Sequence, residues 1–194
     1  MDLVIEQPTG LFDKIFIEAL KERKIYLNQE IDASVIEIIC ATIRQINWED
    51  TKKNIPVEQR EPIEVYISSP GGSSYDGFAA VNAIVTSKTP VHTYCEGYAM
   101  SMGLAIFAAG HKRFAYPYTT FMYHEVASGV FGKNIEIERQ NKENKRIQGM
   151  YDNLLMSRTE MKKTQLDKVK KDSLDWFFDA EEALKMGLIH EIVK

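Results

Sequence analysis

The chain has 194 residues, of which 44% are hydrophobic and 27% are charged, and its formal net charge is -4. This length and composition are ordinary for one globular domain with a sizeable core, and we interpret residues 1–194 as a single domain. The small acidic excess argues against nucleic acid or an anionic membrane as the main partner.

Cys40 and Cys95 lie far apart, and neither belongs to a Cys-x-x-Cys pair. A structural zinc site is therefore not expected, and two buried reduced thiols are favoured over a disulfide. The first residues carry several acidic side chains, unlike a secretory signal, and the most apolar window, 99–110, is too short to span a bilayer. The sequence predicts a cytoplasmic protein that uses no metal or other cofactor.

Apolar residues at helical spacing predict a first helix over 11–23, which a short strand over 24–27 follows. A second buried stripe predicts a helix from Asp32 to about Asn47. The next segment, 48–62, is polar and contains two prolines, so it is predicted to be an exposed loop.

The middle of the chain alternates between strands and helices. The predicted elements are a strand over 63–67, a Ser-Pro-Gly-Gly turn over 69–72, a helix over 75–87, a strand over 91–95, a helix over 97–110, and short strands over 113–115 and 120–124. Such alternation implies right-handed βαβ crossovers and therefore an α/β layered fold.

A long polar helix is predicted over 134–161, because every residue between Glu138 and Arg146 is polar or charged. Its expected buried stripe consists of Ile135, Ile137, Ile147, Met150, Leu154 and Leu155. A helix that is polar all round for two turns cannot lie fully against its own core. We interpret it as an arm that projects or packs against another subunit. The alternative is a solvated helix held by pairs such as Glu138 with Lys142.

Ser101 stands near the start of a predicted helix, within Gly97-Tyr-Ala-Met-Ser-Met-Gly103. Free N–H groups and the helix dipole favour negative charge there, which suits a nucleophile that generates an oxyanion. The Gly-x-Ser-x-Gly elbow is not matched, because the upstream glycine lies four residues before the serine rather than two. Taken alone, this segment favours a helix-capping serine.

The turn at Ser69-Pro-Gly-Gly72 is a second candidate element of the site, since glycines after a strand can turn a peptide N–H outward. Most such stretches are simple turns. Together with a helix-start serine one βα crossover later, the turn suggests an oxyanion pair made by the N–H groups of Gly72 and Met102.

A serine nucleophile needs a general base. The candidate bases are His92, His111, His124 and His190. His124 is favoured because it ends a predicted strand, at an edge where loops carry function. The orienting carboxylate would come from a segment next to the aromatic run 176–178. Periodicity does not choose among its three candidates, Asp172, Asp175 and Asp179.

Four motifs in register make the chain resemble the Clp protease proteolytic subunit (ClpP) family over nearly its whole length. They are Ser69-Pro-Gly-Gly72, Gly97-x-Ala-x-Ser-Met-Gly103, Met122-x-His124, and Ala180-Glu-Glu-Ala183 with Gly187-Leu-Ile189. The resemblance implies a crotonase-like α/β fold with a protruding handle helix. It also implies that residues 1–20, beginning with Val4-Ile-Glu-Gln7, form an axial N-terminal segment and first helix, and that residues 125–160 form the handle region.

The resemblance also assigns roles within the site. Ser101 matches the nucleophile, His124 the base and Asp175 the acid of a Ser-His-Asp triad, and Gly72 and Met102 match the oxyanion-hole donors. The segment from Glu125 to Gly132 matches the one that pairs with an extended substrate. The residues expected to bind substrate are Ser73, Glu125, Val126 and Ala127.

The implied activity is that of a serine endopeptidase, which hydrolyses short or unfolded polypeptides inside an oligomeric ring. The expected partners are further copies of the chain, in heptameric rings that the handle joins into a tetradecamer, and an AAA+ unfoldase. The chain has no GxxxxGK[ST] loop of its own for ATP hydrolysis.

Several positions depart from the family pattern. Val126 replaces a common proline, the stretch 171–174 lacks an acidic-arginine pair, and Glu64 and Glu96 occupy rim positions that are often apolar. A divergent or phage-type relative fits these differences. The alternatives are a non-catalytic ring subunit, a phage capsid-maturation peptidase of the same fold, and a crotonase-type enzyme that acts on acyl-CoA thioesters.

Overall fold

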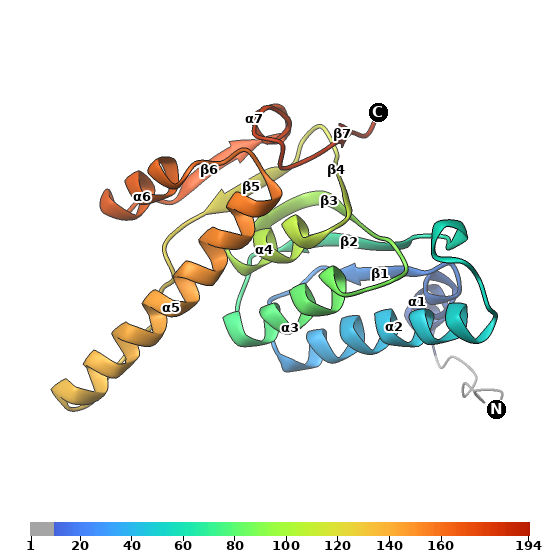
Figure 1. Ribbon diagram of the computed structural model, residues 1–194, viewed down its shortest axis with the longest axis horizontal. Coiled ribbons are helices and arrows are strands. Elements are labelled where there is room, and N and C mark those ends of the chain that lie inside the picture. The colour runs from blue at the N-terminus through green and yellow to red at the C-terminus, as the bar shows by residue number, and fades with distance from the viewer. Residues whose placement is uncertain (1–9) are drawn as a thin grey trace.

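The computed structural model describes residues 10–194, so the expected axial stretch Val4–Gln7 lies outside the described residues. The elements are α1 (Leu11–Lys21), β1 (Lys24–Leu27), α2 (Ala33–Lys52), the 3-10 helix η1 (Val57–Gln59), β2 (Ile63–Ser69), α3 (Ser74–Val85), β3 (Val91–Met100), α4 (Met102–Ala109), β4 (Lys112–Ala115), β5 (Thr120–Tyr123), α5 (Asn134–Arg158), α6 (Lys163–Lys171), β6 (Trp176–Asp179), α7 (Ala180–Lys185) and β7 (Glu191–Ile192). Figure 1 shows α2, α3 and α4 along one face of the strands, with α5 extending away.

The sheet is parallel in the order β1-β2-β3-β4-β7, and a branch leads from β3 through β5 to β6. The first half of β3 pairs with β4, whereas Tyr98–Met100 pairs with β5, and only the pairing of β5 with β6 is antiparallel. This mixed topology confirms the α/β fold class. It also places the end of β3 and the end of β5 side by side.

The side chains of β2 alternate between the two faces of the sheet. Ile63, Val65 and Ile67 are fully buried under the helices, as period-two patterning requires. The opposite face carries a row of aromatic rings in register across four strands, which stack with centroids 4.7–5.3 Å apart. The rings in this aromatic row belong to Tyr26, Tyr66, Tyr94 and Phe114.

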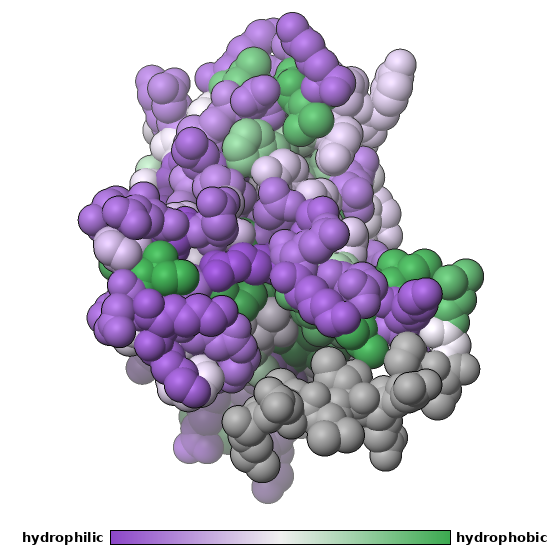
Figure 2. Space-filling view, turned by 90° about the vertical axis from the view of Figure 1, so that its right-hand side faces the viewer, coloured by the Kyte–Doolittle hydropathy of each residue, from purple (hydrophilic) through white to green (hydrophobic). Residues whose placement is uncertain are grey.

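The prediction that α2 ends near Asn47 is wrong, because the helix continues to Lys52. The segment predicted to be one exposed loop therefore begins with helix and also contains η1. The cause is Asp50, whose side chain is fully buried although the sequence around it is polar. Figure 2 shows this end of the molecule, where the surface is mostly hydrophilic and hydrophobic residues are scattered.

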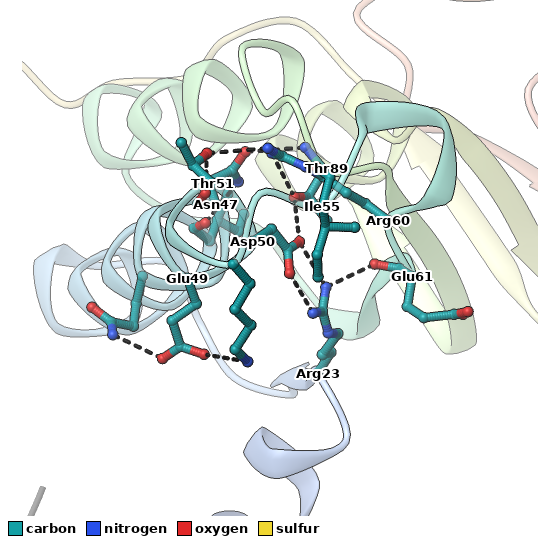
Figure 3. Close-up of polar contacts among 12 residues, drawn as sticks. Arg23, Asn47, Glu49, Asp50, Thr51, Ile55, Arg60, Glu61 and Thr89 are labelled. Carbon is teal, nitrogen blue, oxygen red and sulfur yellow. Dashed lines mark hydrogen bonds and ion pairs between the residues drawn. The ribbon is translucent and has the colours of Figure 1, made fainter. Parts of the chain in front are cut away.

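Asp50 is held by a network of hydrogen bonds (Figure 3). The guanidinium of Arg23 donates to both carboxylate oxygens, at 2.6 and 2.9 Å, and the hydroxyl of Thr89 donates at 2.8 Å. Arg60 closes the segment that follows α2, since it donates to the carbonyl of Ile55 and to the hydroxyl of Thr51, both at 3.1 Å. The polar residues of this segment thus fix its path.

Replacing Asp50 by asparagine should lower the free energy of unfolding by about 1–3 kcal/mol at pH 7, because the half-buried guanidinium of Arg23 loses the carboxylate that accepts its hydrogen bonds. The hydrogen bonds from Arg23 hold the pKa of Asp50 below its ordinary value. A lowered folded-state pKa stabilises the protein above the unfolded-state pKa of about 3.9, and this contribution is lost as the pH falls through the folded-state value. The difference in the free energy of unfolding between variant and wild type should therefore become smaller below about pH 4.

The measurement is urea denaturation at fixed protein concentration over this pH range. Glu49→Gln is the matched control, because Glu49 is exposed and its pair with Lys53 spans 4.0 Å, so its loss should cost under about 0.5 kcal/mol. Equal losses of unfolding free energy in the two variants would contradict the stabilising role of the Asp50 network.

The end of β3 also differs from the prediction. The strand was expected to stop between Cys95 and Gly97, but β3 runs to Met100; α4 begins at Met102, close to the helix start expected near Ser101. The strand continues because it leaves β4 and takes β5 as its new neighbour beyond Gly97. The extension delivers Ser101 to the junction of strand and helix.

The predicted stripe of α5 is only partly buried. Ile147 and Leu155 lie in the core, whereas Ile135 is 52% and Met150 38% exposed. Figure 1 shows the first half of α5 extending away from the body, in agreement with the exposure of Ile135. The buried face of the second half includes polar residues that periodicity did not identify, Gln148 and Asp152 among them.

Cys40 and Cys95 are both buried and free. Among residues 10–194, no helix combines the length and the apolar character that crossing a membrane requires.

Candidate active site

Ser101 connects β3 to α4 in a backbone conformation that is rare for a non-glycine residue, with φ 52° and ψ -124°. Ser101 is the N-cap residue of α4, as the helix-capping interpretation expected, but its hydroxyl makes no capping bond to the helix. The strained residue fits because Gly71 lies against it: a Cβ on Gly71 would be 2.7 Å from the Cβ of Ser101. Strain of this kind gathers at functional sites.

Besides its bonds within α4, the backbone of Ser101 is held by hydrogen bonds to two other elements. Its N–H donates to the carbonyl of Met122 at 2.9 Å, and its carbonyl accepts from the hydroxyl of Tyr151 at 2.8 Å. Burial raises the pKa of Tyr151 well above its ordinary value, so the phenol stays a neutral donor. Tyr151 belongs to α5, and that helix therefore helps to hold the residue that the sequence singled out as a nucleophile.

His124 follows β5 directly and meets Ser101, with its Nε2 atom 2.8 Å from the serine Oγ. The other histidines are engaged elsewhere. His111 and His190 accept backbone hydrogen bonds at their Nδ1 atoms, and the ring of His92 packs on Phe114. The structure thus brings one histidine to the serine, and it is the one favoured from its position in the sequence.

The structure distinguishes the three candidate carboxylates by the groups that each one faces. Asp175 lies with its Oδ1 atom 3.6 Å from Nδ1 of His124, which is within ion-pair range but too long for a hydrogen bond, and its side chain is 58% exposed. Asp179 caps α7 by accepting from Glu182 N–H at 2.8 Å, and Asp172 is the C-cap residue of α6. Of the three, only Asp175 faces the histidine.

The turn after β2 places Gly72 opposite Met102 in a cavity of about 220 Å³ that Ser101 and His124 also line. Gly71 and Gly72 adopt φ angles of 100° and 145°, which only glycine adopts readily. Hydrogen bonds on either side of Gly72 pair the turn with Ile31, from Ile31 N–H to Gly71 and from Ser73 N–H to Ile31, each 2.8 Å long. They leave the Gly72 N–H unused within residues 10–194.

The candidate substrate-binding residues lie in two places. Val126 and Ala127 line both the small cavity and a larger one of about 750 Å³, and Glu125 lines the larger one. Ser73 lines neither cavity, because it is the N-cap of α3 and its hydroxyl accepts from Asp76 N–H at 3.4 Å. The structure therefore separates Ser73 from the other three.

Sequence reasoning missed the polar residues of α5 that support this region. Tyr151 bonds to Ser101, and Gln148 accepts from the N–H of Val126 at 2.6 Å. A signal was present, since both share a helical face with Ile147 and Leu155 at the spacing of a buried stripe. A polar side chain on such a face requires a specific partner.

A serine hydroxyl that lies 2.8 Å from an imidazole nitrogen, in a cavity that Gly72 and Met102 also line, has a geometry compatible with nucleophilic catalysis. A second finding identifies the family. The Clp protease model matches residues 8–194, essentially the whole chain, and the chain therefore belongs to the Clp protease family. Membership places it among ClpP-type peptidases, in agreement with the resemblance of its motifs.

Proposed function

We propose that this chain is a serine endopeptidase with Ser101 as nucleophile, His124 as general base and Asp175 as the acid. The observation that carries the proposal is the 2.8 Å contact between His124 Nε2 and Ser101 Oγ at a strained strand-to-helix junction. A hydroxyl in this contact can lose its proton to the imidazole as it attacks a carbonyl carbon.

The proposed reaction follows from the positions of these groups. Ser101 Oγ attacks the scissile carbonyl, and His124 takes the proton and returns it to the leaving amine. The N–H groups of Gly72 and Met102 hold the oxyanion, which the N-terminus of α4 also favours. Water then hydrolyses the acyl-enzyme by the same proton transfers. Asp175 would stabilise the imidazolium once it closes the present 3.6 Å gap.

Extended polypeptides are the proposed substrates. Residues 124–132 belong to no strand and most of them are exposed, so their backbone groups, apart from the Val126 N–H that bonds to Gln148, are available to a chain laid beside them. An added strand is bound mainly through its main chain, which explains how one site accepts many sequences. Val126 and Ala127 would line the groove for its side chains.

Assembly with further copies is part of the proposal, in heptameric rings that α5 joins into a tetradecamer. Apolar side chains near Asp175 support it, since Leu174 is 55% and Phe177 53% exposed in the isolated chain. Copies that covered them would also shield Asp175 from water. An AAA+ unfoldase would dock on the aromatic row, where Glu64 accepts from the hydroxyl of Tyr66 at 2.9 Å.

The test is labelling with a fluorophosphonate probe of serine hydrolases, followed by mapping of the labelled peptide and sizing of the labelled species. Labelling on Ser101 in a large ring, lost in Ser101→Ala, is the expected result. An intact ring that takes no label, with or without an unfoldase, would instead identify a non-catalytic subunit.

A further inference from the structure

A buried polar cluster lies behind the segment that follows His124. Its members are Tyr123 from β5, Gln148 and Asp152 from α5, and Lys170 from α6. Tyr123 is fully buried, while Gln148 and Asp152 are 8% and 7% exposed. Burying so many polar groups is costly unless each finds a partner, so their contacts are specific.

Asp152 is the centre of the cluster. Its Oδ1 atom accepts from the hydroxyl of Tyr123 at 2.6 Å and from Nε2 of Gln148 at 2.7 Å, and its Oδ2 atom pairs with the ammonium of Lys170. Burial disfavours the charge on Lys170, but its hydrogen bonds with Asp152 and Asp167 outweigh this effect and raise its pKa. Asp152 therefore acts as an acceptor on both oxygens.

This arrangement determines how the amide of Gln148 is oriented. Its NH₂ group must face Asp152 and the oxygen of Tyr123, because the carboxylate only accepts. The amide oxygen is then directed at the backbone of the segment after β5, where it accepts from Val126 N–H at 2.6 Å. The side chain of α5 thus holds a peptide group two residues beyond His124.

We propose that Gln148 is a positioning residue that sets the path of the substrate-pairing segment, an inference that rests on the proposed peptidase function. Residues 125–132 have no strand ladder to hold them. Val126 and Ala127 line the cavity beside Ser101, so fixing the Val126 peptide fixes the direction of both. Lys170 extends the same cluster to α6, which leads to Asp175.

A positioning role predicts a specific kinetic signature. Gln148→Met keeps the length of the side chain but removes the acceptor, which leaves the segment free to move away from an extended peptide. The KM for a peptide long enough to pair with residues 125–132 should rise about tenfold, while kcat changes by less than about threefold. A short acylating probe needs no such pairing, so the rate of Ser101 labelling should fall much less than kcat/KM.

Gln148→Glu tests the same contact by pH. Its carboxylate can still accept from Val126 N–H but faces Asp152, so the KM should be raised at pH 8. It should approach the wild-type value as the pH falls and the new carboxyl group takes up a proton. A residue that served only to fill the core would not show this recovery.

The matched control is Gln45→Met on α2, because within residues 10–194 the exposed amide of Gln45 bonds only to Glu49 on the same helix, at 2.9 Å. All variants are measured as assembled protein, sized on the same samples. A Gln148→Met enzyme with the KM of the control would overturn the inference. So would a fall in kcat and in the labelling rate as large as the rise in KM. Wild-type protein that neither labels nor hydrolyses peptide would overturn the proposed function itself, and this inference with it.

Discussion

Replacing Ser101 by alanine is expected to lower kcat for peptide hydrolysis roughly 10⁶-fold, the scale of loss when a serine nucleophile is removed. No other hydroxyl can substitute for it, because only Ser101 Oγ lies 2.8 Å from Nε2 of His124 among the described residues. The measurement is initial-rate hydrolysis of a long unstructured peptide at saturating concentration.

The fold should survive this change, since alanine at φ 52° is no more strained than serine. Ser157→Ala is the control, because in the described part of the chain the hydroxyl of Ser157 bonds only to the carbonyl of Leu154 on α5. Circular dichroism and sizing should match wild type for both variants. If Ser101→Ala kept more than about one part in a hundred of the activity, the nucleophile would have to be another residue.

Gly72→Ala should produce the second largest loss, a fall in kcat of about 10²–10³-fold. A Cβ at this position would lie 2.4 Å from the carbonyl oxygen and 2.8 Å from the nitrogen of Ile31, and both are backbone atoms that cannot rotate away. The φ of 145° is also unfavourable for alanine. The turn must therefore shift, which withdraws the Gly72 N–H from the cavity beside Ser101.

Gly149→Ala is the matched control, because a Cβ there meets nothing within 4 Å and alanine suits a helix better than glycine. Rates are compared per labelled site, so that a loss of folded protein is separated from a loss of catalysis. A Gly72→Ala enzyme within threefold of wild type would exclude this N–H from stabilising the oxyanion.

The fold class and most elements could be predicted from sequence because they follow from local patterning. Strands such as 63–67 alternate between buried and exposed faces, and this pattern survives in the structure. Errors arose where tertiary contacts override the local signal. Gly97 suggested the end of a strand, but β3 continues past it by changing partner from β4 to β5. The polar sequence around Asp50 suggested a loop, yet Arg23 pairs with that carboxylate in the interior.

The candidate site could also be predicted only where its features depend on neighbouring residues in the sequence. The position of Ser101 before a helix and that of His124 at a strand end were visible, because both depend on neighbouring residues. Choosing Asp175 among three aspartates needed either the family resemblance or three-dimensional structure, because what separates them is a distance to a residue about 50 positions away. Gln148 was missed for the same reason, since two of its partners, Tyr123 and Val126, lie outside α5.

Every residue of α4 is buried, and this helix begins with Met102 directly after Ser101. At Gly103 the helix packs tightly against β2, because a Cβ there would lie 2.9 Å from the carbonyl oxygen of Ser69. Packed interiors transmit displacement rather than absorb it, so added volume in α4 would move Ser101, the proposed nucleophile. Stability and activity are therefore inseparable along this helix, and selection for greater heat resistance should act instead on exposed positions such as those of α2.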